Sequence, residues 1–290
     1  TLRHVYYDAI GDLYSYIKGS TGSKKFENHN IVKLGFWPGG DRDGNPFVTA
    51  EITKDVMNEL RLNLMKCYYN DLKRLQHKLT FKAVQDPLNQ LRSNLYTAMF
   101  DSTKDVGYDE IINPLIQIRE ALIDKYNSLY LKDLDKFIDK VKIFKTHFAT
   151  IDIRQDHSMH TKVMTEVLKH KEFIKEDLNE LPEDELVRIL LHEDLELSAK
   201  DFSEDIVKDT IVNISQLKTI QEKNGEEGCN RYIISNSEDI FSVLFVYGLF
   251  RWCGWADKKI SFDIVPLFET MAGMDNSEAT MQKLFGLKEY

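Results

Sequence analysis

Cysteine and long apolar runs are scarce in this sequence. Its three cysteines, Cys67, Cys229 and Cys253, lie far apart and form no CxxC pair, so they provide no disulfide framework and fit a reducing cytoplasm. No apolar run approaches the roughly 18 residues that a membrane-spanning helix needs. The sequence also contains no P-loop, GxGxxG, GxSxG or HExxH motif, so it lacks the common signatures of nucleotide-binding proteins, serine hydrolases and zinc peptidases.

Positive charge is also in short supply. The net charge is −9 and the lysines are scattered, which argues against a nucleic-acid backbone as a partner. The 42% of hydrophobic residues can build a substantial core, and a mean hydropathy of −0.38 is typical of a soluble protein rather than a membrane protein. The chain of 290 residues begins at Thr1 with no signal peptide, so we expect a piece of a longer protein or a processed chain.

Residues 1–145 have the pattern of a helical unit. Apolar residues recur at helical spacing, with short connections between the periodic segments. This predicts helices over 1–18, 49–80, 86–101, 109–127 and 130–143. Aromatic residues at the same spacing are typical of core packing, and we expect it of Tyr68, Tyr69, Tyr96 and Phe100.

Residues 146–290 alternate short apolar strands with helices. We predict strands over 146–153, 231–235 and 261–268, with 154–156 as a polar turn, and helices over 158–171, 186–192, 203–222, 240–252 and 277–285. Such alternation implies parallel strands in an α/β fold, where ligands bind at the carboxyl ends of the strands. Those ends carry Arg154, Ser235 and Glu269, which include an arginine and a carboxylate suited to an anionic substrate and a hard metal ion.

The segment LGFWPGGDRDGNP, residues 34–46, precedes the long helix predicted from Thr49. It holds Arg42 between Asp41 and Asp43, with glycine and proline on both sides. Two interpretations stay open. The three side chains form an internal salt-bridge cluster that staples the loop, or the arginine is oriented to bind an oxyanion such as a phosphate or carboxylate.

Two metal-binding patterns are weak. The DRDGN segment faintly resembles a calcium loop, but Pro46 and Ile52 stand where an EF-hand needs Gly and Glu. His157 and His160 are spaced to share a helix face, but no third ligand is nearby, which favours a helix-terminal or solvated pair over a zinc site. Glu269 follows a very apolar segment, so its carboxylate needs a partner, either a cation of the fold or a metal ion.

Three segments together resemble the phosphoenolpyruvate carboxylase family. They are GGDRDGNP at 39–46, followed by Val48 and Thr49; DIRQ at 152–155, followed by His160 and Thr161; and VPLFET at 265–270, followed by a helix. The segment YIIS at 232–235 is similar to a further strand of that family. Order and spacing match, and the likeness covers the chain from end to end.

The resemblance implies a largely helical fold around a (β/α) barrel, of which this chain would hold a part. It implies that Arg154 contacts phosphoenolpyruvate and that Glu269 is one of two carboxylates that hold Mg²⁺ or Mn²⁺. Arg42, Asp41 and Asp43 would lie beside the active site, more in support than in direct chemistry. The implied reaction forms oxaloacetate and phosphate from phosphoenolpyruvate and bicarbonate, in a cytoplasmic lyase that is usually a homotetramer.

The sequence also departs from the family pattern. Asp156 and Met159 replace a glutamate and an arginine, and Met271-Ala272-Gly273-Met274 replaces an LDDL segment. The family's catalytic-histidine segment, second metal-binding aspartate and mobile Gly- and Arg-rich loop are missing. We therefore expect residues 1–290 to be a central fragment that is inactive alone. The alternatives are a non-catalytic interaction or regulatory module that kept the scaffold, and a different Mg²⁺-dependent enzyme for an anionic metabolite.

Overall fold

The computed structural model describes residues 5–21, 26–101, 104–255 and 260–289 of the chain. Their contacts define two compact units. Unit 1 comprises Thr1–Gly35, Met57–Thr150 and Lys223–Gly228, and unit 2 comprises Phe36–Val56, Ile151–Glu222 and Cys229–Tyr290. The GGDRDGNP loop therefore belongs to unit 2, with the strands, although it lies in the helical first half of the sequence.

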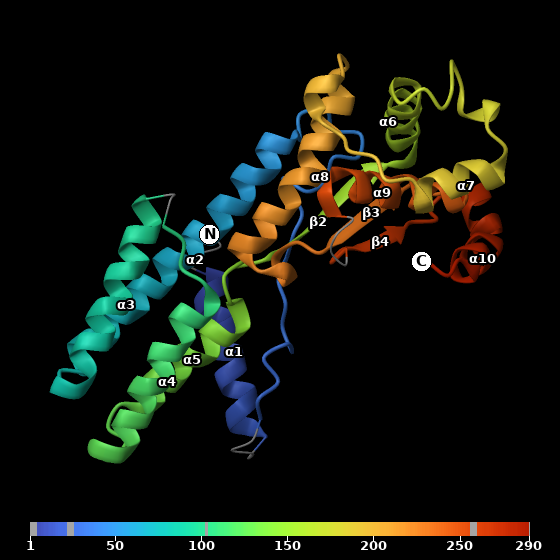
Figure 1. Cartoon of the computed structure of the whole chain (residues 1–290). Helices are drawn as coiled ribbons and strands as arrows, with labels where there is room; N and C mark the ends of the chain where they lie inside the picture. Colours follow the sequence, from blue (N-terminus) through green and yellow to red (C-terminus); the bar gives the residue numbers. More distant parts are fainter. Residues whose placement is uncertain (1–4, 22–25, 102–103, 256–259, 290) are drawn as a thin grey trace. The chain divides into compact units, whose positions relative to one another are not determined.

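Unit 1 is built from helices (Figure 1). They are α1 (Tyr7–Ser20), α3 (Lys82–Phe100), α4 (Tyr108–Lys125), α5 (Leu131–Phe144) and the larger part of α2 (Ala50–Lys78). The helices predicted for this half are confirmed, with ends that shift by a few residues, but residues 1–4 of the helix predicted over 1–18 lie outside the described part of the chain. The apolar periodicity that predicted them forms the core, where these side chains are fully buried: Leu64, Tyr68, Leu72, Leu88, Leu122 and Val141.

The aromatic residues of this unit divide into two groups. Tyr68 lies in the core as predicted, but Tyr96 and Phe100 are 52% and 74% exposed, so their assignment to the core is wrong. Both lie on one outer face of α3, where Tyr96 contacts Tyr69 and Phe100 at ring separations of 5.9 and 4.9 Å. Helical spacing shows which residues share a face, but it does not show which face is buried.

A parallel sheet is the centre of unit 2. Its strands lie in the order β1 (Gly35–Phe36), β2 (Thr150–Asp156), β3 (Arg231–Ser235) and β4 (Asp263–Pro266). Strand β3 pairs in parallel with β2 on one side, Asp156 opposite Ser235, and with β4 on the other, Ile234 opposite Pro266. This confirms the α/β fold with parallel strands, while closure into a barrel stays a prediction.

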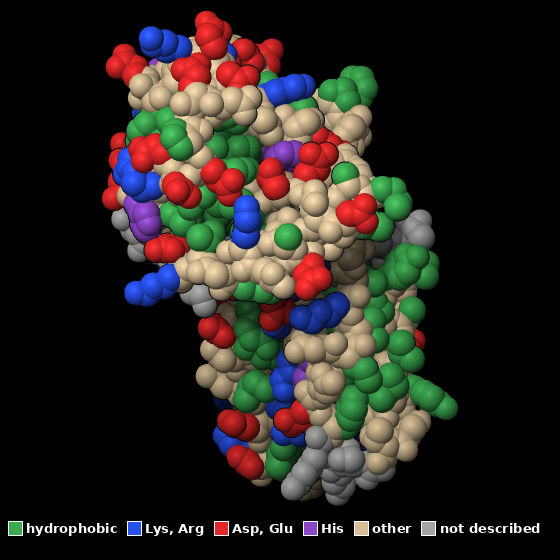
Figure 2. Space-filling view, turned by 90° about the vertical axis from the view of Figure 1, so that its right-hand side faces the viewer, with side chains coloured by type: hydrophobic (Ala, Val, Ile, Leu, Met, Phe, Trp, Pro, Cys, Tyr) green, Lys and Arg blue, Asp and Glu red, His purple; other side chains and the backbone are tan. Residues whose placement is uncertain are grey.

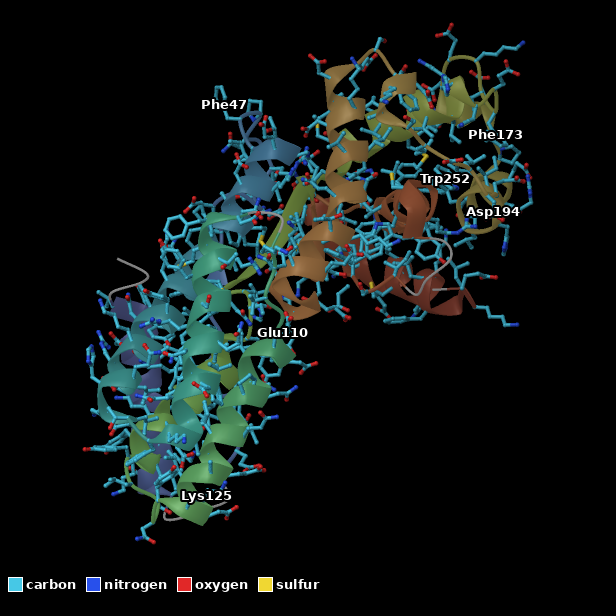
Figure 3. The ribbon with its side chains drawn as sticks, turned by 60° about the vertical axis from the view of Figure 1, so that its left-hand side comes forward. Phe47, Glu110, Lys125, Phe173, Asp194 and Trp252 are labelled. Atoms are coloured by element: carbon cyan, nitrogen blue, oxygen red, sulfur yellow. The ribbon has the colours of Figure 1, made fainter. Side chains whose placement is uncertain are left out.

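Helices accompany the strands of unit 2 (Figure 1). They are α6 (His157–His170), α7 (Glu183–His192), α9 (Ile240–Phe250), α10 (Met271–Gly286) and most of α8 (Asp205–Asn224). Helix α9 is apolar on all sides because it is buried, in contact with α6, α7, α10 and β4. It continues into the π-helical turn Arg251–Trp255, where buried Trp252 (Figure 3) donates from Nε1 to the carbonyl of Glu193 at 2.9 Å.

Two predicted boundaries are wrong. Strand β2 begins at Thr150 and continues through Asp156, so residues 154–156 are strand rather than a polar turn. The pairing with β3 continues to Asp156, and Gln155, which points to the opposite face from Arg154 and Asp156, is buried despite its polarity. Helix α10 begins at Met271 rather than near 277, because the Thr270 hydroxyl accepts from the Gly273 N–H at 2.9 Å and caps the helix.

The surface of unit 2 is strongly acidic. Figure 2 views the side on which α7 and α10 lie and shows many carboxylate groups there, and Glu183 and Asp184 of α7 are exposed. A surface of this charge repels polyanions. Within the described residues, no helix is both long and apolar enough to cross a membrane.

Candidate active site

Arg154, at the carboxyl end of β2, lies beside Glu269, which follows β4. Its Nη2 is 3.4 Å from Glu269 Oε1 and 2.9 Å from Asp43 Oδ2, and its guanidinium carbon lies 5.7 Å from the centre of the Trp37 ring. The side chain is 20% exposed, so the guanidinium is held on several sides but open to a ligand. Strands β2 and β4 both flank β3, and the shared direction of the strands brings these residues to one edge of the sheet.

The GGDRDGNP loop is fixed to β2 by backbone hydrogen bonds. The Arg42 N–H donates to the Arg154 carbonyl at 2.8 Å, and the Arg154 N–H donates to the Gly40 carbonyl at 2.9 Å. A Cβ on Gly40 would lie 2.1 Å from the carbonyl oxygen of Asp152, and Gly39 has a φ of +86°. Gly40 is therefore required by close packing and Gly39 by its backbone conformation. This close approach of the loop to β2 brings the Asp43 carboxylate to 2.9 Å from the Arg154 guanidinium.

The charged residues of the loop have separate partners. Arg42 pairs with Asp209 of α8, whose Oδ1 also accepts from the Ala50 N–H at 2.8 Å at the start of α2. Asp43 pairs with Arg154, and Asp41 accepts a hydrogen bond from Trp37 Nε1. The interpretation as an internal Asp-Arg-Asp staple is therefore wrong. The loop is fixed by contacts to other elements, and the functional roles of Arg42, Asp41 and Asp43 stay predictions.

Asn236 connects two carboxylates and was not anticipated from the sequence. Its backbone N–H donates to Glu269 Oε1 at 3.2 Å, and its Nδ2 donates to Asp156 Oδ2 at 2.6 Å. Its φ of +52° is one that asparagine tolerates better than most residues. Ser235, the residue predicted for this strand end, is fully buried. The expectation that a functional residue lies at the carboxyl end of this strand was therefore correct to within one residue, since Asn236 rather than Ser235 makes the contacts.

Asp156 caps helix α6. Its Oδ1 accepts from the Ser158 N–H at 2.7 Å and from the Ser158 hydroxyl. Partial burial acts to raise the pKa of this carboxyl, but the hydrogen bonds from Ser158 and Asn236 outweigh it, and the pKa is lower than usual. The Asp156 carboxylate therefore stabilises unit 2 above the ordinary pKa of an aspartate, about 4, and this contribution is lost as the pH falls through the lowered value.

We expect Asp156→Asn to lower the free energy of unfolding by about 1 kcal/mol at pH 7, because the charge at the start of α6 is lost. At pH 3 the difference from the unsubstituted protein should shrink, since this pH lies below the ordinary pKa of an aspartate and the unfolded chain then binds a proton at this position. Urea unfolding followed by tryptophan fluorescence measures both values. Asp275→Asn, at an exposed position of α10 beyond its first turn, is the control and should change the free energy of unfolding little at either pH. A loss of equal size at both pH values would contradict the prediction.

The histidine pair lies at a helix end, one of the two predicted alternatives, because His157 is the first residue of α6 and His160 is in its first turn. His160 is fully buried, with Nε2 3.0 Å from the Tyr232 hydroxyl, and burial lowers its pKa to about 3, so it is neutral. His157 contacts the Thr161 hydroxyl through Nε2 at 3.4 Å. Each imidazole therefore has its own protein partner.

Glu269 provides oxygen ligands of the kind that Mg²⁺ and Mn²⁺ prefer. In this structure, however, its carboxylate is shared between Arg154 and the Asn236 N–H. In the part of the chain that the structure describes, no group of three or more His, Cys, Asp or Glu side chains is arranged to hold a metal ion. The donor type therefore fits a divalent metal, but the described residues do not provide enough ligands to complete a site.

Fold and site together define an α/β protein with an arginine, paired with two carboxylates, at the carboxyl ends of parallel strands. A family model for phosphoenolpyruvate carboxylase matches residues 2–106 and 91–290. The chain therefore belongs to the phosphoenolpyruvate carboxylase family, which confirms the resemblance seen in the sequence.

Curated relatives agree with this assignment. The chain is 25% identical to phosphoenolpyruvate carboxylase of Synechococcus sp. over 354 aligned residues, which cover 99% of this chain and 34% of that protein. It is 26% identical to the enzyme of Vibrio atlanticus, with 98% of this chain and 35% of that protein covered. It is 28% identical to the enzyme of Haemophilus influenzae, with 89% and 32% covered. The chain thus spans about a third of the length of these relatives.

Proposed function

We propose that this chain is the central part of a phosphoenolpyruvate carboxylase, a lyase that forms oxaloacetate and phosphate from phosphoenolpyruvate and bicarbonate. The observation that supports it most is the Arg154 guanidinium, oriented by Asp43 and Glu269 at the strand ends of a chain from this family. The complete protein would be a cytoplasmic homotetramer, and the isolated chain would be inactive.

Arg154 is suited to bind the substrate. A guanidinium presents a planar pair of N–H donors to a phosphate or a carboxylate, and phosphoenolpyruvate carries both groups. Its contact with Asp43, at 2.9 Å, is shorter than its contact with Glu269, at 3.4 Å. We infer that Asp43 keeps the guanidinium in place while the arriving anion replaces Glu269, whose carboxylate stays held by the Asn236 N–H.

Mg²⁺ or Mn²⁺ is the cofactor that we propose for the complete protein, with Glu269 as one ligand. Its further ligands would come from outside this chain, because no group of three or more His, Cys, Asp or Glu side chains among the described residues is arranged to hold the ion. The Arg154 contact also neutralises Glu269, so the isolated chain should compete poorly with water for the metal.

A coupled assay with malate dehydrogenase tests the proposed function. The longer protein encoded by the complete reading frame should oxidise NADH in the presence of phosphoenolpyruvate, bicarbonate and Mg²⁺. The 290-residue chain alone should give the rate of the blank, because one metal carboxylate without the remaining groups cannot assemble the site. Turnover by the isolated chain would refute the fragment proposal. Absence of turnover by a folded longer protein would instead favour the non-catalytic module.

A further inference from the structure

Unit 2 contains a cavity that the proposed active site does not use. It encloses about 840 Å³ between the loop that leads into α2, the start of α6 and the first turns of α8. This volume is within the usual range for small-molecule sites. The residues around it include Arg42 and Gln155, but neither Arg154 nor Glu269. Since Arg154 and Gln155 are successive residues of β2, their side chains point to opposite faces of the sheet, so the cavity is separate from the site at Arg154.

Arg42 is one of the residues that line the cavity. The Arg42 side chain is 3% exposed and pairs with Asp209 through Nη2. Among the described residues, its Nε and Nη1 have no hydrogen-bond partner, although both are buried. Buried N–H groups of a guanidinium are costly to leave unpaired, and the acceptor that suits them is an anionic oxygen. The protein itself therefore pairs only part of the Arg42 guanidinium, and the remaining N–H groups could donate to an anionic ligand.

The charges around Arg42 limit what the anion can be. Lys208 also lines the cavity, but so do Glu51, Asp205 and Asp209. With more carboxylates than cations at the walls, a dianion such as a phosphate ester is disfavoured, and a single negative charge fits better. A carboxylate is the common biological group with one charge and two acceptor oxygens.

Several apolar side chains also line the cavity, beside the polar Asn45, Thr49 and Gln155. These apolar side chains are Pro46, Val48, Met159, Ile206 and Val212. Phe47, between two of them in sequence, projects away from the chain and is 84% exposed (Figure 3), so it leaves the cavity open. We propose that this cavity binds a small monocarboxylic acid with an aromatic or branched apolar body, its carboxylate on Arg42 and its body against these apolar side chains. The proposal does not depend on the proposed enzymatic function.

Fluorine NMR titration of the 290-residue chain tests this directly, with 4-fluorobenzoate, 4-fluorobenzyl alcohol and 4-fluorophenyl phosphate as probes. The acid should bind at least about tenfold more tightly than the alcohol, which has the same ring but no charge, and more tightly than the phosphate ester. Equal affinities of acid and alcohol, tighter binding of the phosphate ester, or no saturable binding would each overturn the proposal.

Two tryptophan variants test whether the probes bind in this cavity. Val212 is 43% exposed at the cavity wall, so Val212→Trp should fill the space without disturbing the core and weaken binding of both acid and alcohol about tenfold or more. Ile123→Trp is the matched control at a 42% exposed helical position of unit 1 and should change neither affinity. Binding that survives Val212→Trp would overturn the proposal.

The double variant Arg42→Gln with Asp209→Asn removes the ion pair without changing the net charge. The amide oxygen introduced by Asp209→Asn can still accept the hydrogen bond from the Ala50 N–H, so the start of α2 keeps its cap. In this variant the alcohol should bind as before, and the preference for the acid should disappear. If Val212→Trp fails to fold, as judged by circular dichroism, this variant decides alone: an acid preference that persists in it overturns the proposal.

Discussion

Gly40→Ala should destabilise unit 2 by at least about 3 kcal/mol, because overpacking against backbone cannot be relieved by a side-chain rotation. A Cβ at this position would lie 2.1 Å from the Asp152 carbonyl oxygen and 2.5 Å from the Ile151 side chain. The loop would have to move off β2 and give up the backbone hydrogen bonds that join Gly40 and Arg42 to Arg154. All three tryptophans lie in unit 2, so urea unfolding followed by tryptophan fluorescence reports on this unit.

Two other glycines of the same segment provide matched controls. A Cβ on Gly35 or Gly44 would meet no atom within 4 Å, but Gly44 has a φ of +64°. Gly44→Ala should therefore cost about 1 kcal/mol for the left-handed backbone alone, and Gly35→Ala about 0.5 kcal/mol or less. The expected order of destabilisation separates the effect of steric overlap, at Gly40, from the effect of the left-handed backbone, at Gly44. If Gly40→Ala cost no more than Gly44→Ala, the close packing of the loop on β2 would be wrong.

The sequence predicted Arg154 and Glu269 as neighbours for a sound physical reason. Parallel strands that share one direction bring their carboxyl ends to one edge, so residues 115 positions apart meet at 3.4 Å. The rule needs only the positions of the strands. The prediction held although residues 154–156 of β2 were wrongly interpreted as a turn. In either case Arg154 follows the apolar part of the strand.

The partners of the loop could not be predicted in the same way. Arg42 meets Asp209, which is 167 positions away on a helix whose other carboxylates are equally plausible partners from sequence. Local charge pairing suggested Asp41 and Asp43 instead, yet in a loop fixed to a strand edge successive side chains point in different directions. Trp37 was likewise missed, although its ring faces the Arg154 guanidinium at 5.7 Å. Such contacts depend on tertiary packing, which periodicity does not contain.

The largest effect on activity is expected from Arg154→Lys in the longer protein, where kcat/KM for phosphoenolpyruvate should fall about 10²–10³-fold. Lysine keeps the charge but loses the planar pair of donors and the flat face that Trp37 contacts, so charge alone should not rescue the variant. Because Asp43 would hold a shorter, more mobile cation, we expect KM for phosphoenolpyruvate to rise as well as kcat to fall.

Arg231→Lys is the control for this substitution, because Arg231 pairs with Asp152 at 3.2 Å on the neighbouring strand and is 45% exposed. An exposed pair of this kind contributes little, so kcat/KM should stay within about threefold of the unsubstituted protein. The coupled assay with malate dehydrogenase measures both variants, and circular dichroism checks that both are folded. A folded Arg154→Lys protein with an unchanged KM and kcat would remove Arg154 from the substrate site, and the strand-end geometry would then need another explanation.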